Sequence, residues 1–126
     1  MPALYKIDKP NRFVISIASD PLSPDDILRH QQLLADDPEF DPSYSQLLDF
    51  SEVTLFNFTA ADVRILAQAN LFSPNSRRAI VAKSEVIFGL ARMFEAFRDL
   101  AGESGIRVFR DRNEALDWVL AKRPTT

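Results

Sequence analysis

The chain of 126 residues contains no cysteine, and this absence excludes several kinds of site. Without thiols there is no disulfide framework, no catalytic thiolate and no cysteine ligand for a metal ion. Cysteine usage therefore gives no information about the redox compartment in which the protein works.

Glycine is almost as scarce, with three residues at positions 89, 102 and 105. The phosphate-binding loops GxxxxGK and GxGxxG need glycines at fixed spacing, and so does the G-x-S-x-G turn of many hydrolases. None of these patterns can be assembled here. Nucleotide binding of those two kinds and the common hydrolase arrangement are therefore excluded.

The only histidine is His30, so a Ser-His-Asp triad or a histidine-centred metal site would have to use it. Helical spacing puts it at the edge of a buried stripe, which predicts a surface or boundary histidine. The acidic run at residues 36–41 lacks the glycine and the spacing of an EF-hand loop. We therefore interpret that run as a solvated loop rather than a calcium site, and expect no cofactor.

Long apolar runs are also missing, because none approaches the ~18 residues that a transmembrane helix needs. The first ten residues lack the basic and apolar segments of a secretory signal, so a cytoplasmic protein with no transmembrane segment is expected. A net charge of −3 disfavours nucleic acid as a partner. Hydrophobic residues make up 46% and charged residues 26%, which predicts one globular domain over residues 1–126 with a loose tail at 123–126.

The pattern of apolar residues and helix caps predicts five strands and four helices. Strands are expected at residues 4–8, 12–18, 46–50, 78–82 and 106–109. Helices are expected to begin after the caps Ser23, Thr59, Ser84 and Asp111, and to run to about Ala35, Phe72, Ala101 and Lys122. The order ββαβαβαβα predicts an α/β fold with a single mixed, mainly parallel five-stranded sheet that begins with a hairpin.

Two of the predicted helices carry features that suggest contacts. In the helix that follows Ser84, Phe88 falls on the face of Arg92, Glu95 and Asp99, opposite the apolar Val86, Leu90, Met93, Phe94, Phe97 and Leu100. Because aromatic and arginine residues are enriched in interface hot spots, Phe88 and Arg92 are candidates for a partner surface. The helix that follows Thr59 is apolar on two sides, so its second side should meet another helix, a dimer mate or an apolar ligand.

Two polar residues near the third strand have two interpretations each. Asp49 ends a strand at its carboxyl end, where open α/β sheets bind ligands, or it ties the following loop to a backbone N–H. Thr59 is expected to cap a helix, and its hydroxyl could alternatively lie where a phosphate meets the helix N–H groups.

The segment Leu48-Asp49-Phe50-Ser51-Glu52-Val53-Thr54, followed by a capped helix, resembles the centre of the STAS or SpoIIAA-like family. In that family an Asp-Ser-Ser-Gly helix start carries a phosphorylated serine; here Asn57, Phe58, Thr59 and Ala60 occupy those positions. The segments FGLARMFEAF at 88–97 and VFRDRNEALDWV at 108–119 are similar to an uncharacterised bacterial STAS/SEC14-like branch. The resemblance implies a SpoIIAA-like fold.

Two main hypotheses for the function follow. The first is a non-enzymatic bacterial regulatory domain that docks a protein partner, or a second copy of itself. Its surface would include Asp49, Asn57, Phe58, Thr59, Phe88 and Arg92. The alternative is a small binding module for a lipid or other apolar ligand, with the helix at 59–72 as part of the wall. An enzyme would have only Asp49, Thr59 and His30 as candidate groups.

Overall fold

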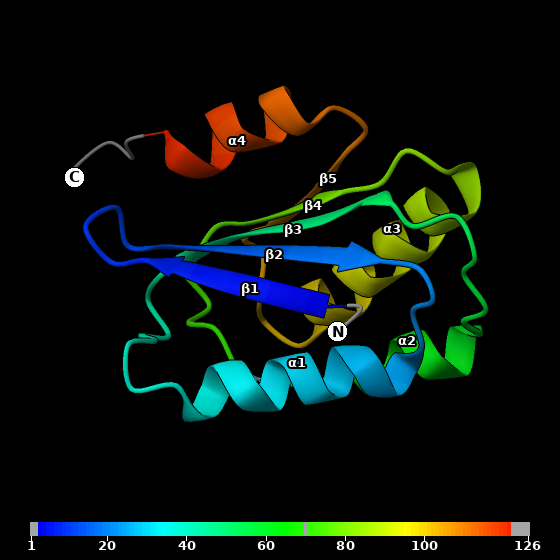
Figure 1. Cartoon of the computed structure of the whole chain (residues 1–126), viewed down its shortest axis with the longest axis horizontal. Helices are drawn as coiled ribbons and strands as arrows, with labels where there is room; N and C mark the ends of the chain where they lie inside the picture. Colours follow the sequence, from blue (N-terminus) through cyan, green and yellow to red (C-terminus); the bar gives the residue numbers. More distant parts are fainter. Residues whose placement is uncertain (1–2, 70, 122–126) are drawn as a thin grey trace.

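The computed structural model of the protein describes residues 3–69 and 71–121, so the predicted loose tail at 123–126 lies outside the described residues (Figure 1). The predicted order ββαβαβαβα is confirmed. The strands are β1 Ala3–Asp8, β2 Phe13–Ser19, β3 Ser45–Glu52, β4 Arg78–Val81 and β5 Ile106–Phe109. The helices are α1 Pro24–Asp36, α2 Ala60–Leu66, α3 Glu85–Leu100 and α4 Arg112–Leu120.

The five strands form one mixed sheet in the order β1-β2-β3-β4-β5. β1 and β2 pair antiparallel across the turn at Pro10 and Asn11, and the pairs from β2 to β5 are all parallel. The predicted fold class, a mainly parallel sheet that opens with a hairpin, is therefore confirmed.

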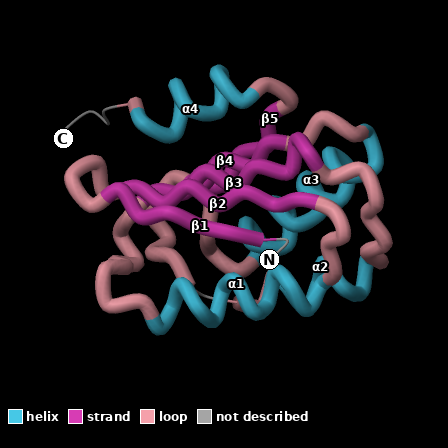
Figure 2. The backbone as a smooth tube through the Cα atoms, in the orientation of Figure 1, coloured by secondary structure: helices cyan, strands magenta, loops and turns pink. Residues whose placement is uncertain are grey.

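The helices divide unequally between the two faces of the sheet. α1, α2 and α3 lie on one face and α4 alone lies on the other (Figures 1 and 2). Because successive side chains of a strand point to opposite faces, each strand contributes residues to the apolar layers on both sides of the sheet. On β2, for example, Phe13 joins the apolar cluster under α4, whereas Val14 and Ala18 join clusters under the other helices. The broad, three-helix layer encloses an apolar cavity.

Side-chain caps begin the helices as the sequence predicts. Ser23 and Thr59 each accept a hydrogen bond from the backbone N–H three residues later, and the aspartate at that position accepts one in return. Such a cap stabilises a helix by about 1 kcal/mol. At the start of α4 the Asp111 carboxylate accepts from the Asn113 N–H.

α2 is shorter than predicted, because it ends at Leu66 rather than near Phe72. Phe72 leaves the helical path to pack edge-on against Phe40, 5.2 Å away between ring centroids, in the cluster of Leu34 and Tyr44. The backbone N–H of Ser73 then donates to the carbonyl of Pro42 at 2.8 Å. Burial of Phe72 away from the helix therefore outweighs the local helical pattern.

The predicted buried face of α3 is wrong by a rotation. Ile87, Ala91 and Arg98 are the buried residues, whereas Val86 is 64% exposed and Leu100 is 85% exposed. The pattern of apolar residues along α3 is misleading because the buried face includes a charged residue, Arg98. That arginine is buried because an acidic residue, Glu103, neutralises it.

Candidate functional site

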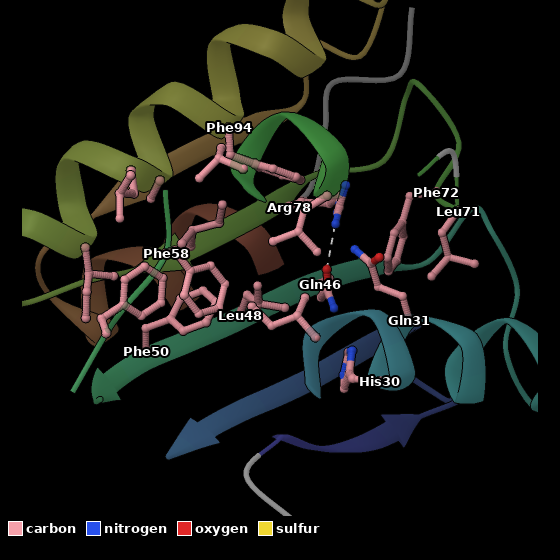
Figure 3. Close-up of a pocket in the computed structure, with 18 residues that line it drawn as sticks. His30, Gln31, Gln46, Leu48, Phe50, Phe58, Leu71, Phe72, Arg78 and Phe94 are labelled. Atoms are coloured by element: carbon pink, nitrogen blue, oxygen red, sulfur yellow. Dashed lines mark hydrogen bonds between the residues drawn. The ribbon is translucent and has the colours of Figure 1, made fainter. Parts of the chain in front are cut away.

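A cavity of about 70 Å³ lies between the sheet and the layer of α1, α2 and α3 (Figure 3). Eighteen of the described residues line it, and four of these are polar: His30, Gln31, Gln46 and Arg78. The apolar lining comes from Ile27, Leu48, Phe50, Phe56, Phe58, Val63, Leu66, Leu71, Phe72, Ile80, Ile87, Leu90, Ala91 and Phe94. The cavity thus has a large apolar wall and a small polar group of residues.

Three phenylalanines from β3 and the following loop form one part of the apolar wall. Phe56 stacks on Phe58 with ring centroids 4.0 Å apart, and meets Phe50 edge-on at 6.4 Å. Asp20 holds this loop in place, because its carboxylate accepts hydrogen bonds from the N–H groups of Thr54 and Leu55. Hydrogen bonding lowers the pKa of Asp20, and the hydrogen bond from the Thr54 hydroxyl contributes most to this shift.

A chain of hydrogen bonds joins the polar residues on the sheet side of the cavity. Arg78 Nε donates to Gln46 Oε1 at 3.2 Å, and Gln46 Nε2 donates to Ser16 Oγ at 3.0 Å. Because arginine is only a donor, this fixes the orientation of the Gln46 amide. The Ser16 hydroxyl proton is then available to His30 Nε2, which lies 2.9 Å from Ser16 Oγ.

His30 is buried, so its predicted position at the surface or boundary is wrong. Burial lowers the pKa of His30 to about 4, with a smaller contribution from the positive charge of Arg78. The imidazole is therefore neutral at pH 7, with its proton on Nδ1 if Ser16 donates to Nε2. Sequence periodicity misses this burial because the groups that cover His30 lie on other elements. Ser16 is on β2, and Tyr5 of β1 packs edge-on against the His30 ring, with the two ring centroids 5.5 Å apart.

Arg78 also belongs to a buried ion cluster. Arg78 Nη1 and Arg98 Nε bind the same carboxylate, that of Glu103, at 3.2 and 2.8 Å. Glu103 reaches Arg98 because Gly102, with φ of 101°, turns the chain back after α3 so that the Glu103 N–H donates to the Arg98 carbonyl. Arg98 Nη1 donates to the Ala67 carbonyl just after α2, so the cluster connects α2, α3 and β4.

Gln31 is the remaining polar residue of the lining, and it differs from the others. Its Oε1 atom is buried and accepts no hydrogen bond from any described residue. Buried polar atoms in proteins are nearly always paired, since an unpaired one costs about 1–3 kcal/mol. An amide oxygen with no partner therefore faces a mostly apolar cavity.

Asp49 lies on the opposite face of the sheet from this cavity. Its carboxylate accepts from Arg112 Nη1 at 2.9 Å, at the start of α4, and from the Ser51 N–H at 2.9 Å. The interpretation in which Asp49 ties the loop to a backbone N–H is the one the geometry matches. Asp49 and His30 do not share a site.

The acidic loop at residues 36–41 uses its carboxylates to shape its own backbone. Asp37 accepts from the Glu39 N–H and from the Tyr5 hydroxyl, and Asp41 accepts from the Ser43 N–H. Within residues 3–69 and 71–121, no three histidine, aspartate or glutamate side chains gather as ligands for a metal ion.

Comparison with known proteins gives one informative likeness. No family model and no curated protein matches the chain. A solved structure does: an uncharacterized protein from the DUF3478 family, with a SpoIIAA-like fold, from Shewanella loihica PV-4. It is 22% identical to this chain, has a TM-score of 0.60, and the match covers 93% of each chain.

This chain has a SpoIIAA-like fold. The resemblance implied by the sequence around Asp49 is thereby confirmed at the level of the fold. The solved relative is itself uncharacterized, so the likeness carries no activity. In the part of the SpoIIAA-like chain that the structure describes, no helix is long and apolar enough to cross a lipid bilayer.

Thr59, the only hydroxyl at the helix start that resembles the SpoIIAA-like phosphorylation motif, is a structural cap. Its Oγ1 accepts from the Asp62 N–H at 3.1 Å, while Asp62 accepts from the Thr59 N–H at 2.8 Å. A phosphate on this oxygen would lie beside the Asp62 carboxylate, and like charges repel. Phe58, at the preceding motif position, lines the cavity instead.

Phe88 and Arg92, the other predicted surface residues, lie one turn apart on α3 but differ in exposure. The prediction that Phe88 is exposed on the charged face is wrong, because it is half-buried against the core and covered by the Arg110 guanidinium, 3.9 Å from the ring centroid. Arg92 is exposed and pairs with Glu95 at 3.6 Å. Asn57 is exposed on the loop before α2.

Proposed function

We propose that this SpoIIAA-like chain is a small, non-enzymatic binding module that takes up an apolar ligand between its sheet and α1, α2 and α3. The observation that carries the proposal is the apolar cavity. Protein interiors are close-packed and leave few voids larger than a water molecule, whereas ligand sites are concave, mostly apolar and contain a few placed polar groups.

The size of the cavity limits the ligand. One water molecule needs about 10–15 Å³ of cavity volume. A cavity of about 70 Å³ therefore accommodates a short chain or a small ring rather than a whole membrane lipid. Burial of the ligand would release about 25 cal/mol for each Å² of apolar surface removed from water. The ligand class is therefore a small, largely apolar molecule.

The arrangement of the candidate catalytic groups supports a binding role over an enzymatic one. Asp49 pairs with Arg112 on the α4 face, whereas His30 and its partner Ser16 lie on the other face. Thr59 is engaged in its helix cap. Asp49, Thr59 and His30 therefore make no hydrogen bond with one another, as a catalytic set built from these three groups would need.

An Ala91→Leu variant tests the binding role. Ala91 lines the cavity from α3, so the larger side chain would occupy ligand volume, and we expect the affinity for 1-octanol to fall at least about tenfold. Filling a void should preserve or raise the melting temperature. The measurement is isothermal titration calorimetry of wild type and variant.

Ala96→Leu is the matched control, because Ala96 is exposed on the same helix. It should bind 1-octanol as wild type does. If neither 1-octanol nor octanoate binds the wild-type chain saturably, the proposal is wrong.

Docking of a protein partner is the second candidate function. The observation in its favour is Leu55, which is 70% exposed on the loop from β3 to α2, near the exposed Asn57. Isolated apolar residues are common on surfaces, so this support is weaker than that of the cavity. A second copy of the chain is one partner that such a surface would fit.

A Leu55→Asp variant tests docking without disturbing the core, because this side chain is exposed. We expect a dimer of the wild type in sedimentation equilibrium to dissociate at least about tenfold more readily in the variant, since a charge would enter an apolar contact. A wild-type chain that sediments as a monomer at every concentration would count against self-docking.

A further inference from the structure

The ion cluster beside the cavity leaves Arg78 short of negative charge. Glu103 is its ion-pair partner, and the same carboxylate also serves Arg98. Among the described residues no other acid lies within ion-pair distance of Arg78. Because Glu103 is only 2% exposed and Arg78 is buried too, water does little to screen this imbalance.

Arg78 also has donor capacity that the protein does not use. Its Nε donates to Gln46 and its Nη1 to Glu103, whereas Nη2 makes no hydrogen bond with any of the described residues. The rings of Phe72 and Phe94 lie near the guanidinium, at 4.5 and 5.8 Å from its central carbon, and Arg78 lines the cavity. A planar guanidinium with free N–H groups is suited to a carboxylate.

Gln31 supplies a second hydrogen-bonding group on the helix side of the same cavity. Figure 3 shows its amide on α1 beside Gln46 and Phe72, on the side of the cavity where Arg78 lies. The amide is unpaired at Oε1, and rotation by about 180° about its last bond would present the NH₂ group at the same place. It can therefore donate to an anion that also contacts Arg78.

We propose that the ligand of this cavity is a short-chain monocarboxylic acid, with its carboxylate between Arg78 and Gln31 and its alkyl tail against Phe50, Phe56 and Phe58. This inference rests on the proposed binding function. The other polar residues do not compete for the head group, because Gln46 and His30 are already joined through Ser16. The negative charge of the ligand supplies the counterion that Arg78 otherwise shares with Arg98.

Octanoate and 1-octanol separate the head group from the tail, because their alkyl chains match. In calorimetric titrations of the full chain at pH 7, octanoate should bind at least about tenfold more tightly than 1-octanol. A Gln31→Leu variant should lose about tenfold in octanoate affinity and less than about threefold in 1-octanol affinity. This variant should remain folded, since it removes a buried polar atom that has no partner.

Two further variants sharpen the test. Gln32→Leu makes the same change at the next, exposed position of α1, and both affinities should stay at the wild-type values. Gln31→Glu places a carboxylate inside the cavity, so it should abolish octanoate binding and leave 1-octanol binding in place. If 1-octanol binds wild type as tightly as octanoate does, or if Gln31→Leu leaves octanoate binding unchanged, the carboxylate site is wrong while the apolar binding function stands. If neither ligand binds, both proposals fail.

Discussion

A Glu103→Gln variant is expected to lose about 3–5 kcal/mol of folding free energy. The substitution keeps the shape of the side chain but removes the charge that Arg78 and Arg98 share at 3.2 and 2.8 Å. Two buried guanidinium groups would then remain without their common counterion. Since small domains are stable by only about 5–15 kcal/mol, this loss is a large part of the total.

Urea denaturation followed by circular dichroism measures the effect. With a slope of about 1–3 kcal/mol per molar urea, the midpoint should fall by at least about 1 M. The control is Glu95→Gln, which removes a partly exposed acid from its 3.6 Å pair with Arg92 and should cost less than about 1 kcal/mol. Equal shifts in the two variants would show that the buried cluster contributes no more than a surface pair.

The elements of the fold could be predicted because local signals and the global structure agree. Apolar runs bounded by turn residues form all five strands, and cap residues such as Ser23 and Thr59 begin their helices with reciprocal hydrogen bonds. The end of α2 could not be read locally, because Phe72 packs against Phe40, which is distant in the sequence.

The buried ion cluster beside the cavity could not be predicted because its charged residues look like surface residues. Arg98 follows Ile87, Ala91 and Phe94 at helical spacing, so a buried arginine on an apolar face was the available signal. Its meaning depends on Glu103, which reaches it only through the turn at Gly102. Spacing along one element does not reveal a counterion that another segment supplies.

The candidate site residues show the same limit. The sequence makes Phe58 a candidate through its place in a motif, whereas the structure places it in the wall of the cavity. The sequence makes Asp49 a candidate through its place near a strand end, but the alternation of side chains along β3 points it toward α4 and Arg112. In the sequence, a single histidine is a candidate catalytic group. In the structure, burial beside Ser16 keeps the His30 imidazole neutral.

A Gly105→Ala variant is expected to destabilise the protein by about 3 kcal/mol or more, the upper part of the range for overpacking. A Cβ atom on Gly105 would lie 2.0 Å from the backbone carbonyl oxygen of Ser76, a distance at which the backbone must move. The neighbouring Gly105 carbonyl accepts from the Arg78 N–H at 2.9 Å, where β4 begins to pair with β5. Relief of the clash would therefore disturb the strand pairing that positions Arg78.

Gly89→Ala provides a control in which the same chemical change should have the opposite sign. Gly89 lies within α3, and a Cβ there would meet nothing within 4 Å, so alanine should stabilise the helix by about 1 kcal/mol. Thermal denaturation should thus rank the three proteins as Gly89→Ala, wild type and Gly105→Ala, in order of falling melting temperature. If Gly105→Ala melts at the wild-type temperature, the loop at Ser76 must move away from the new methyl group at little cost. The start of β4, and with it Arg78, would then be less rigidly fixed than the cavity requires.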